Sequence, residues 1–241
     1  MRLEPGLSKR TSLKRLHQAG LKPATVFDVG VADGTPELYG VFEDVRYVLI
    51  EPLKEAEAFL SRFVERYPGS VVVHAAAGAR TGNANLIVTR NLSGSSFLFK
   101  PRAGESRIVP VVTLDEVAVQ YALPEPYLVK LDVQGYELEV LAGAEQSLGK
   151  TAAVVAEVSL WGDRKANGMA EFAALVHWMR EREFVLFDIA QIARRDFDDA
   201  ITEMDLVFVP AASPLRSNSS YKTPQAAEVS ASIGRRKFGL T

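Results

Sequence analysis

Glycine and acidic residues at positions 28–34 could form a ligand-binding turn. The stretch reads Asp-Val-Gly-Val-Ala-Asp-Gly, and Gly30 and Gly34 would let the backbone approach a ligand without a Cβ in the way. A helix that begins near Thr35 and Pro36 would add free backbone N–H groups to the same site. Glycine turns of this kind are typical of several nucleotide-binding folds, so the glycines alone predict only a nucleotide-like ligand.

Two acids narrow the choice of ligand. Asp28 would repel a pyrophosphate but suits the cationic methionyl end of S-adenosylmethionine (SAM), and the dinucleotide spacing G-x-G-x-x-G is missing. Glu51 ends the next apolar run, where doubly wound folds place an acid that accepts hydrogen bonds from both ribose hydroxyls. These residues favour SAM over a nicotinamide cofactor. The competing interpretation is a turn glycine with two surface acids.

A third polar group lies further along, at residues 130–137, which read Lys-Leu-Asp-Val-Gln-Gly-Tyr-Glu. It ends an otherwise apolar strand, and in an open parallel sheet the carboxyl ends of the strands border the ligand crevice. Lys130 and Asp132 are therefore candidates for the chemistry. Because they share one face of the strand, a buried ion pair between them is the other interpretation.

The elements that would position these groups alternate between apolar runs and amphipathic stretches, as in a mostly parallel α/β sheet covered by helices. We expect a doubly wound, Rossmann-like sheet. The predicted strands cover residues 25–29, 47–50, 70–74, 127–131, 152–158, 184–187 and 205–209, and the predicted helices 53–67, 135–148 and 169–182.

Residues 83–112 break the alternation, because extended runs flank a Ser/Gly/Asn cluster there; this predicts a β insertion after the third strand. Thr113 and Glu116 then fit a capping box. We expect one domain over residues 1–210, with an N-terminal helical segment at 1–22, and a flexible tail at 211–241, which is rich in Ser, Ala and Pro.

Composition excludes several classes of protein. The 241 residues contain no cysteine, which removes disulfides, thiolate zinc sites and cysteine nucleophiles. The formal net charge of −2 disfavours nucleic acid as a partner. There is neither a secretory signal nor an apolar run long enough for a membrane span, so we expect a cytoplasmic protein. A homo-oligomer is compatible with the sequence.

The motifs, taken in order, resemble the FkbM-type methyltransferases, SAM-dependent enzymes with the class I Rossmann-like fold. The resemblance runs from about Leu13 to Pro210. That family usually has Lys-Ile-Asp-Val-Glu-Gly where this chain has Gln134 in place of the glutamate. The resemblance rests on residues 21–34, 51–52, 75–78, 113–115, 130–137, 140–143 and Glu157.

The resemblance implies methyl transfer from SAM to a hydroxyl oxygen on a sugar, a glycolipid or a natural product, with S-adenosylhomocysteine as the product. It implies that Lys130 and Asp132 face the transferred methyl group and the acceptor. From their places at the strand ends, Asp132 is the first candidate for the catalytic base and Glu157 the second. Ser95, Ser96, Gln134 and Trp161 are the candidates for acceptor binding. The implied cofactor-binding residues are Asp28, Gly30, Asp33, Gly34, Thr35, Glu51, Pro52, Ala76 and Asp132.

Three further questions stay open at this level. His74 is a further candidate base, whereas His177 is expected in a structural role beside the core. Asp132, Glu157 and Asp163 could converge on a hard cation such as magnesium, but no spacing demands it. The rival functions are a SAM-fold module that binds a ligand or partner without turnover and a nicotinamide dehydrogenase.

Overall fold

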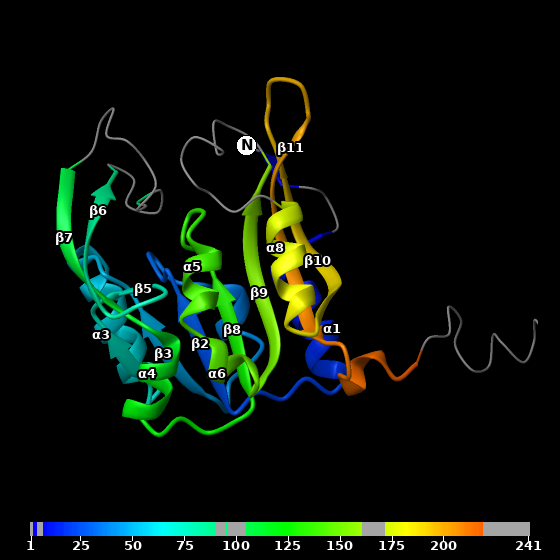
Figure 1. Ribbon diagram of the computed structural model, residues 1–241, viewed down its shortest axis with the longest axis horizontal. Helices are drawn as coiled ribbons and strands as arrows, with labels where there is room; N and C mark the ends of the chain where they lie inside the picture. The colour runs from blue at the N-terminus through cyan, green and yellow to red at the C-terminus, as the bar shows by residue number, and fades with distance from the viewer. Residues whose placement is uncertain (1, 4–6, 90–94, 96–104, 161–171, 219–241) are drawn as a thin grey trace, which may run out of the picture.

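The computed structural model describes residues 2–3, 7–89, 95, 105–160 and 172–218. Within these ranges, eight strands form one mixed sheet in the order β1-β10-β11-β9-β8-β2-β3-β4 (Figure 1). The parallel strands are β2 (Thr25–Val29), β3 (Arg46–Ile50), β4 (Val71–Val73), β8 (Tyr127–Leu131) and β9 (Thr151–Ser159). The closing hairpin is β10 (Phe184–Arg194) and β11 (Ile201–Pro210), with β11 antiparallel to β9 and the short β1 (Arg2–Leu3) along the edge.

Helices cover both faces of this sheet. One face carries α4 (Leu114–Gln120), α5 (Glu137–Ala142), α6 (Glu145–Leu148) and α8 (Phe172–Glu181). The other carries α1 (Lys9–Gln18), the single turn α2 (Pro36–Tyr39) and α3 (Glu57–Arg66), which follows the 3₁₀ turn η1 (Lys54–Ala56). In Figure 1, α5 and α8 lie in front of the strands and α1 behind them. The architecture is the predicted α/β fold with a mostly parallel central sheet.

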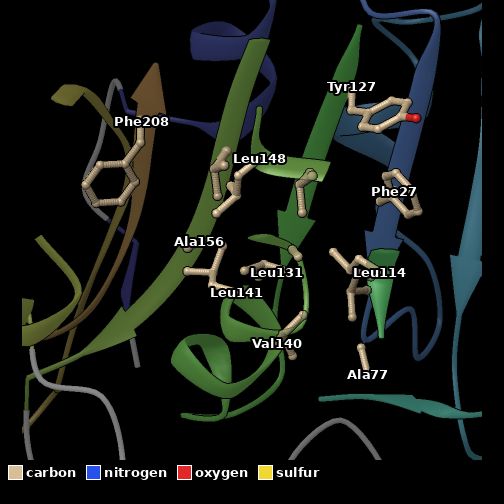
Figure 2. Close-up of a cluster of buried hydrophobic side chains, with 14 of the residues drawn as sticks. Phe27, Ala77, Leu114, Tyr127, Leu131, Val140, Leu141, Leu148, Ala156 and Phe208 are labelled. Atoms are coloured by element: carbon tan, nitrogen blue, oxygen red, sulfur yellow. The ribbon is translucent and has the colours of Figure 1, made fainter. Parts of the chain in front are cut away.

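The side chains of each central strand alternate between the two helix layers. Phe27 and Val29 pack in the cluster that Figure 2 shows, together with Leu141 of α5 and Leu114 of α4. Val26 packs on the opposite side, against α1, α2 and α3. Burial of each such side chain contributes about 1.5–3 kcal/mol, so both layers hold the sheet rigid. Polar residues with the parity of Val26, above all Asp28, therefore point to the α1–α2 side.

The predicted β insertion forms a separate three-stranded sheet. It contains β5 (Ala76–Ala77), β6 (Gly82–Val88) and β7 (Glu105–Val112), with β7 in the middle. Leu86, Val88 and Val109 pack on Leu53 and Ala76, which places this sheet beside the carboxyl end of β3.

Several predicted boundaries agree with the structure, and others do not. The strands at 25–29 and 127–131 agree residue for residue, and the capping box of Thr113 and Glu116 is present. The helix predicted at 135–148 is instead two short helices, because the chain turns at Gly143 and Ala144. Beyond β11 the structure describes one 3₁₀ turn, η2 (Pro214–Arg216), and residues 219–241 of the predicted tail lie outside the described ranges. In the described part of the chain, no helix has the length and apolar character to cross a membrane.

Candidate active site at the carboxyl edge of the sheet

A cavity of about 490 Å³ opens where the parallel strands end. Its size lies within the range of small-molecule sites, and its place is the crevice where open α/β sheets bind ligands. Most of the predicted site residues line it: Gly30, Asp33, Gly34, Thr35, Glu51, Pro52, Ala76, Ser95, Lys130, Asp132, Gln134 and Glu157. Ser96 and Trp161 lie outside the described residues.

The glycine loop is a close-packed turn between β2 and α2. Gly30 has φ +75°, and a Cβ at this position would collide with the carbonyl oxygen of Asp132. Gly34 has φ +96°, and a Cβ there would collide with the ring of Phe59. Both positions therefore need glycine for backbone conformation and for space, which keeps the loop tight against the end of β8.

Glu51 connects this loop to the end of β3. One carboxylate oxygen accepts a hydrogen bond from the Ala32 N–H at 2.9 Å, and the other accepts one from the Leu53 N–H at 2.9 Å. Burial raises the pKa of Glu51, while these two hydrogen bonds oppose the rise. Each oxygen keeps a further lone pair, so Glu51 can also accept hydrogen bonds from ligand hydroxyls in the cavity.

Asp28 and Lys130 form a buried ion pair rather than an open pair of reactive groups. They are register partners on β2 and β8, and the Lys130 Nζ lies 3.0 Å from the Asp28 carboxylate. Asp28 also accepts hydrogen bonds from the hydroxyls of Tyr39 and Thr35 and does not line the cavity. The buried-pair interpretation of Lys130 thus holds with a different partner, because Asp132 is further away, at 3.8 Å.

The environment of Lys130 keeps it protonated. Burial by itself would lower the pKa of this ammonium, but the carboxylates of Asp28 and Asp132 outweigh burial and raise it. The ammonium also donates to the Gly30 carbonyl oxygen at 3.0 Å, which helps to fix the glycine loop. Lys130 is therefore a cation that orders the loop and not a proton acceptor.

Asp132 and Glu157 come together at the other end of the cavity. The Gln134 amide nitrogen donates to the Asp132 carboxylate at 3.1 Å and to the Glu157 carboxyl at 3.2 Å. Burial, and then the charges of Asp132 and Asp205, raise the pKa of Glu157 to about 9. At neutral pH Glu157 therefore holds a proton, whereas the Asp132 side chain is 28% exposed and turned toward the cavity.

Residues 28–186 of the chain match the methyltransferase FkbM domain, more than half of the sequence. The chain belongs to the FkbM methyltransferase family. The match begins at Asp28 and includes Glu51, Lys130, Asp132 and Glu157, so it covers both ends of the cavity. The fold and the family therefore agree with the resemblance seen in the motifs, and the class is that of the SAM-dependent methyltransferases.

Solved structures with a similar fold have low sequence identity to this FkbM-family methyltransferase. The N-methyltransferase NodS from Bradyrhizobium japonicum WM9 is 10% identical, with a TM-score of 0.47 over 84% of this chain and 94% of that one. The magnesium protoporphyrin IX methyltransferase ChlM from Synechocystis PCC 6803, with bound SAM, is 10% identical, with a TM-score of 0.47 over 84% and 77%. The 23S rRNA methyltransferase ErmE is 14% identical, with a TM-score of 0.43 over 97% and 79%. A comparison with curated proteins gave no match.

Two charged residues of the FkbM-family methyltransferase that the motifs did not indicate also belong to this region. The Lys9 ammonium lines the cavity and lies 3.1 Å from the carboxylate of Asp205. Asp205 is buried on β11 opposite Glu157. An acid at the start of the apolar run 205–209 was a possible signal for Asp205, but no sequence pattern distinguishes Lys9 from the other basic residues of α1.

The histidines lie away from the cavity. His74 is exposed beside Glu57 and does not line the site. The expectation that His177 packs beside the core is wrong, because its side chain is 75% exposed on the outer face of α8, next to Glu181. Among the described residues, no group of three or more His, Cys, Asp or Glu side chains is arranged to hold a metal ion, and Asp163 lies outside those residues.

Proposed function

We propose that this FkbM-family methyltransferase binds SAM in the cavity and methylates a hydroxyl oxygen of a small acceptor: a sugar, a glycolipid or another natural product. The observation that carries the proposal is that one cavity has a cofactor-like end and, opposite it, an end lined by acidic side chains. Glu51 and the glycine loop form one end, and Asp132 with Glu157 forms the other. Glu51 follows β3, Asp132 follows β8 and Glu157 lies on β9, so two to three strand spacings of roughly 4.8 Å, about 10–14 Å, separate the two ends.

The residues present fit SAM. The Glu51 carboxylate suits two ribose hydroxyls, and the Ala76 region lies beside the insertion, where an adenine ring would meet apolar side chains. Gly30, Asp33, Gly34 and Thr35 line the middle of the cavity. Asp28 would contribute indirectly, because it holds Lys130 and Thr35 in place. When bound, SAM supplies an electrophilic methyl group on a sulfonium.

Asp132 is the proposed proton acceptor. The Asp132 carboxylate would take up the proton of the acceptor hydroxyl when the methyl group supplied by bound SAM is transferred to that oxygen. Gln134 orients that carboxylate, and the protonated Glu157 can donate a hydrogen bond to the acceptor. Positioning the oxygen about 3 Å from the methyl carbon supplies much of the rate, and a base adds roughly 10²–10⁴-fold.

Gln134 and Ser95 are the proposed acceptor contacts among the described residues. Both line the cavity, and the Ser95 hydroxyl accepts a hydrogen bond from the Thr89 N–H at 3.2 Å, which fixes it at the end of β6. The proposed location is cytoplasmic, and no nucleic acid partner is proposed.

Calorimetry with SAM and with NAD tests the cofactor. We expect SAM to bind and NAD to bind more weakly or not at all; absence of SAM binding would overturn the proposal. Turnover is tested by S-adenosylhomocysteine formation with a panel of glycosides, glycolipids and hydroxylated metabolites. SAM binding without product from any member of the panel would favour a module that binds its ligand without turnover.

A further inference from the structure

The N-terminal helix α1 brings a lysine to the acceptor end of the cavity. Lys9 is the first residue of α1, directly after the N-cap Ser8, whose hydroxyl accepts from the Thr11 N–H at 3.1 Å. Leu13 and Leu16 of α1 are buried in the apolar cluster between the sheet and the helices α1, α2 and α3. The Ser12 hydroxyl donates to Asp188 of β10 at 2.5 Å. The start of α1, and with it Lys9, is therefore held firmly against β10 and β11.

The Lys9 ammonium enters a group of acids that come from separate strands. It pairs with Asp205 at 3.1 Å, and the two side chains are only 12% and 4% exposed. Asp205 on β11 is the register partner of Glu157 on β9. Glu203 of β11 lines the same cavity, as do Asp132 and Gln134 beyond β8. Lys130 is the second cation of this lining, and it is engaged with Asp28.

We propose that Lys9 is a positioning residue of the acceptor site, whose buried ion pair with Asp205 holds a cation beside Glu157 at the acceptor end of the cavity. This inference rests on the proposed function, because it assigns that end of the cavity to the acceptor. Lys9 and Asp205 both lie outside residues 28–186, the part that matches the family domain. The segments that flank this domain in the sequence thus meet at the acceptor end of the cavity.

The direction of the electrostatic effects supports this role. Burial by itself would lower the pKa of Lys9, but Asp205, Asp132 and Glu157 outweigh burial and raise it. In return, the charge of Lys9 lowers the pKa of Glu157, against burial and the neighbouring acids. Without Lys9, the pKa of Glu157 would therefore rise further.

The test is the titration of the Glu157 carboxyl, followed by ¹³C NMR in protein labelled with [¹³C]glutamate. The Glu157 signal is identified by its absence in Glu157→Gln. We expect Lys9→Met to move the midpoint of this signal upward by about one to two pH units, because the cation that pairs with Asp205, the register partner of Glu157, is lost. Lys9→Arg should restore it to near the wild-type value. Lys14→Met, which removes an equal charge from an exposed position on the same helix, is the matched control and should leave it unchanged.

An unchanged Glu157 midpoint in folded Lys9→Met would overturn the proposal and leave Lys9 a purely structural role. If Lys9→Met does not fold, Asp205→Asn tests the same network with the opposite sign. Removing that acid should lower the Glu157 midpoint, and an unchanged midpoint would again overturn the proposal. Calorimetry with SAM separates the two proposals. Absence of SAM binding by the wild-type protein would contradict the proposed function, whereas the titration of Glu157 tests the role of Lys9 alone.

Discussion

The Asp28 carboxylate and the Lys130 ammonium lie 3.0 Å apart on neighbouring parallel strands, with side chains that are 0% and 4% exposed. Asp28 is in turn bonded to Tyr39 and Thr35 of the α2 turn, and Lys130 donates to the Gly30 carbonyl. One ion pair therefore ties β2, β8, α2 and the glycine loop together. It makes the shape of the proposed cofactor end depend on two residues a hundred positions apart.

Removal of one member of this pair should be costly. Lys130→Met leaves Asp28 as a buried unpaired charge, and loss of one partner from a buried pair costs about 3–5 kcal/mol. We expect that loss in the free energy of unfolding measured with urea. Lys150→Met, which breaks an exposed pair with Glu125, is the matched control and should hardly move the denaturation midpoint. A Lys130→Met protein as stable as the control would show that the pair contributes little.

The glycine loop can be tested with two glycines that share a left-handed conformation. Gly20 has φ +110° and nothing within 4 Å of a Cβ, whereas a Cβ on Gly30, at φ +75°, meets the Asp132 carbonyl. Gly20→Ala should therefore show only the conformational cost of about 1–2 kcal/mol. Gly30→Ala should lose clearly more stability in urea and should also lose SAM binding. Equal stability losses in the two variants would contradict the close approach of the loop to β8.

Glu51→Gln should weaken SAM binding. The glutamine amide can accept hydrogen bonds only through its oxygen, because its nitrogen donates. One of the contacts to Ala32, Leu53 or the ribose is therefore lost. A hydrogen bond to a charged group contributes about 1.5–3 kcal/mol, which corresponds to a roughly 10- to 150-fold higher dissociation constant in calorimetry. Glu57→Gln on the exposed face of α3 is the control. Unchanged SAM affinity in folded Glu51→Gln would remove Glu51 from the cofactor site.

Asp132→Asn should separate binding from turnover. The amide keeps the size of the side chain but cannot take up the acceptor proton, so we expect SAM affinity within a few-fold of wild type and a loss of roughly 10²–10⁴ in kcat. The readouts are calorimetry and S-adenosylhomocysteine formation with an active acceptor, and the exposed Asp44→Asn is the control. Near-normal turnover in Asp132→Asn would transfer the role of base to another group.

The stability of the protein should fall as the pH rises above about 4.5. The folded state raises the pKa of Glu157 to about 9 and that of Glu137 to about 7, mainly by burial. Between the ordinary carboxyl pKa and these values the folded state binds more protons than the unfolded state, so each rise in pH costs stability. The stability that these two protonated carboxyl groups contribute is fully present below about pH 4.5 and is lost as the pH rises to about 9.

Urea midpoints from pH 5 to 9 measure this slope. Glu157→Gln cannot titrate, so its stability should change less over pH 7–9 than that of the wild type. The exposed Glu139→Gln is a control that should keep the wild-type slope. A slope that is the same in wild type and Glu157→Gln would mean that Glu157 is ionised in the folded protein at neutral pH.

The main strands could be predicted because their signal is local. Residues 25–29 and 127–131 are short apolar runs in which every side chain is buried, and turn residues bound them. The prediction of one continuous helix at 135–148 was wrong, because contacts with distant segments of the chain interrupt it. A Cβ on Gly143 would collide with the Gly78 carbonyl, and the Asp115 carboxylate accepts from the Gln146 and Ser147 N–H groups at the start of α6.

The sequence by itself determined which polar groups stand at the strand ends and the family to which the chain belongs. Asp28, Glu51 and Asp132 are recognisable because each follows an apolar run at a fixed place in a known order of motifs. Only the tertiary structure decided which of these groups pair and which face the cavity. Strand register placed Asp28 against Lys130 and Glu157 against Asp205, and the packing of α1 on β10 delivered Lys9. Such pairings depend on contacts between segments far apart in the chain, which no local pattern of residues records.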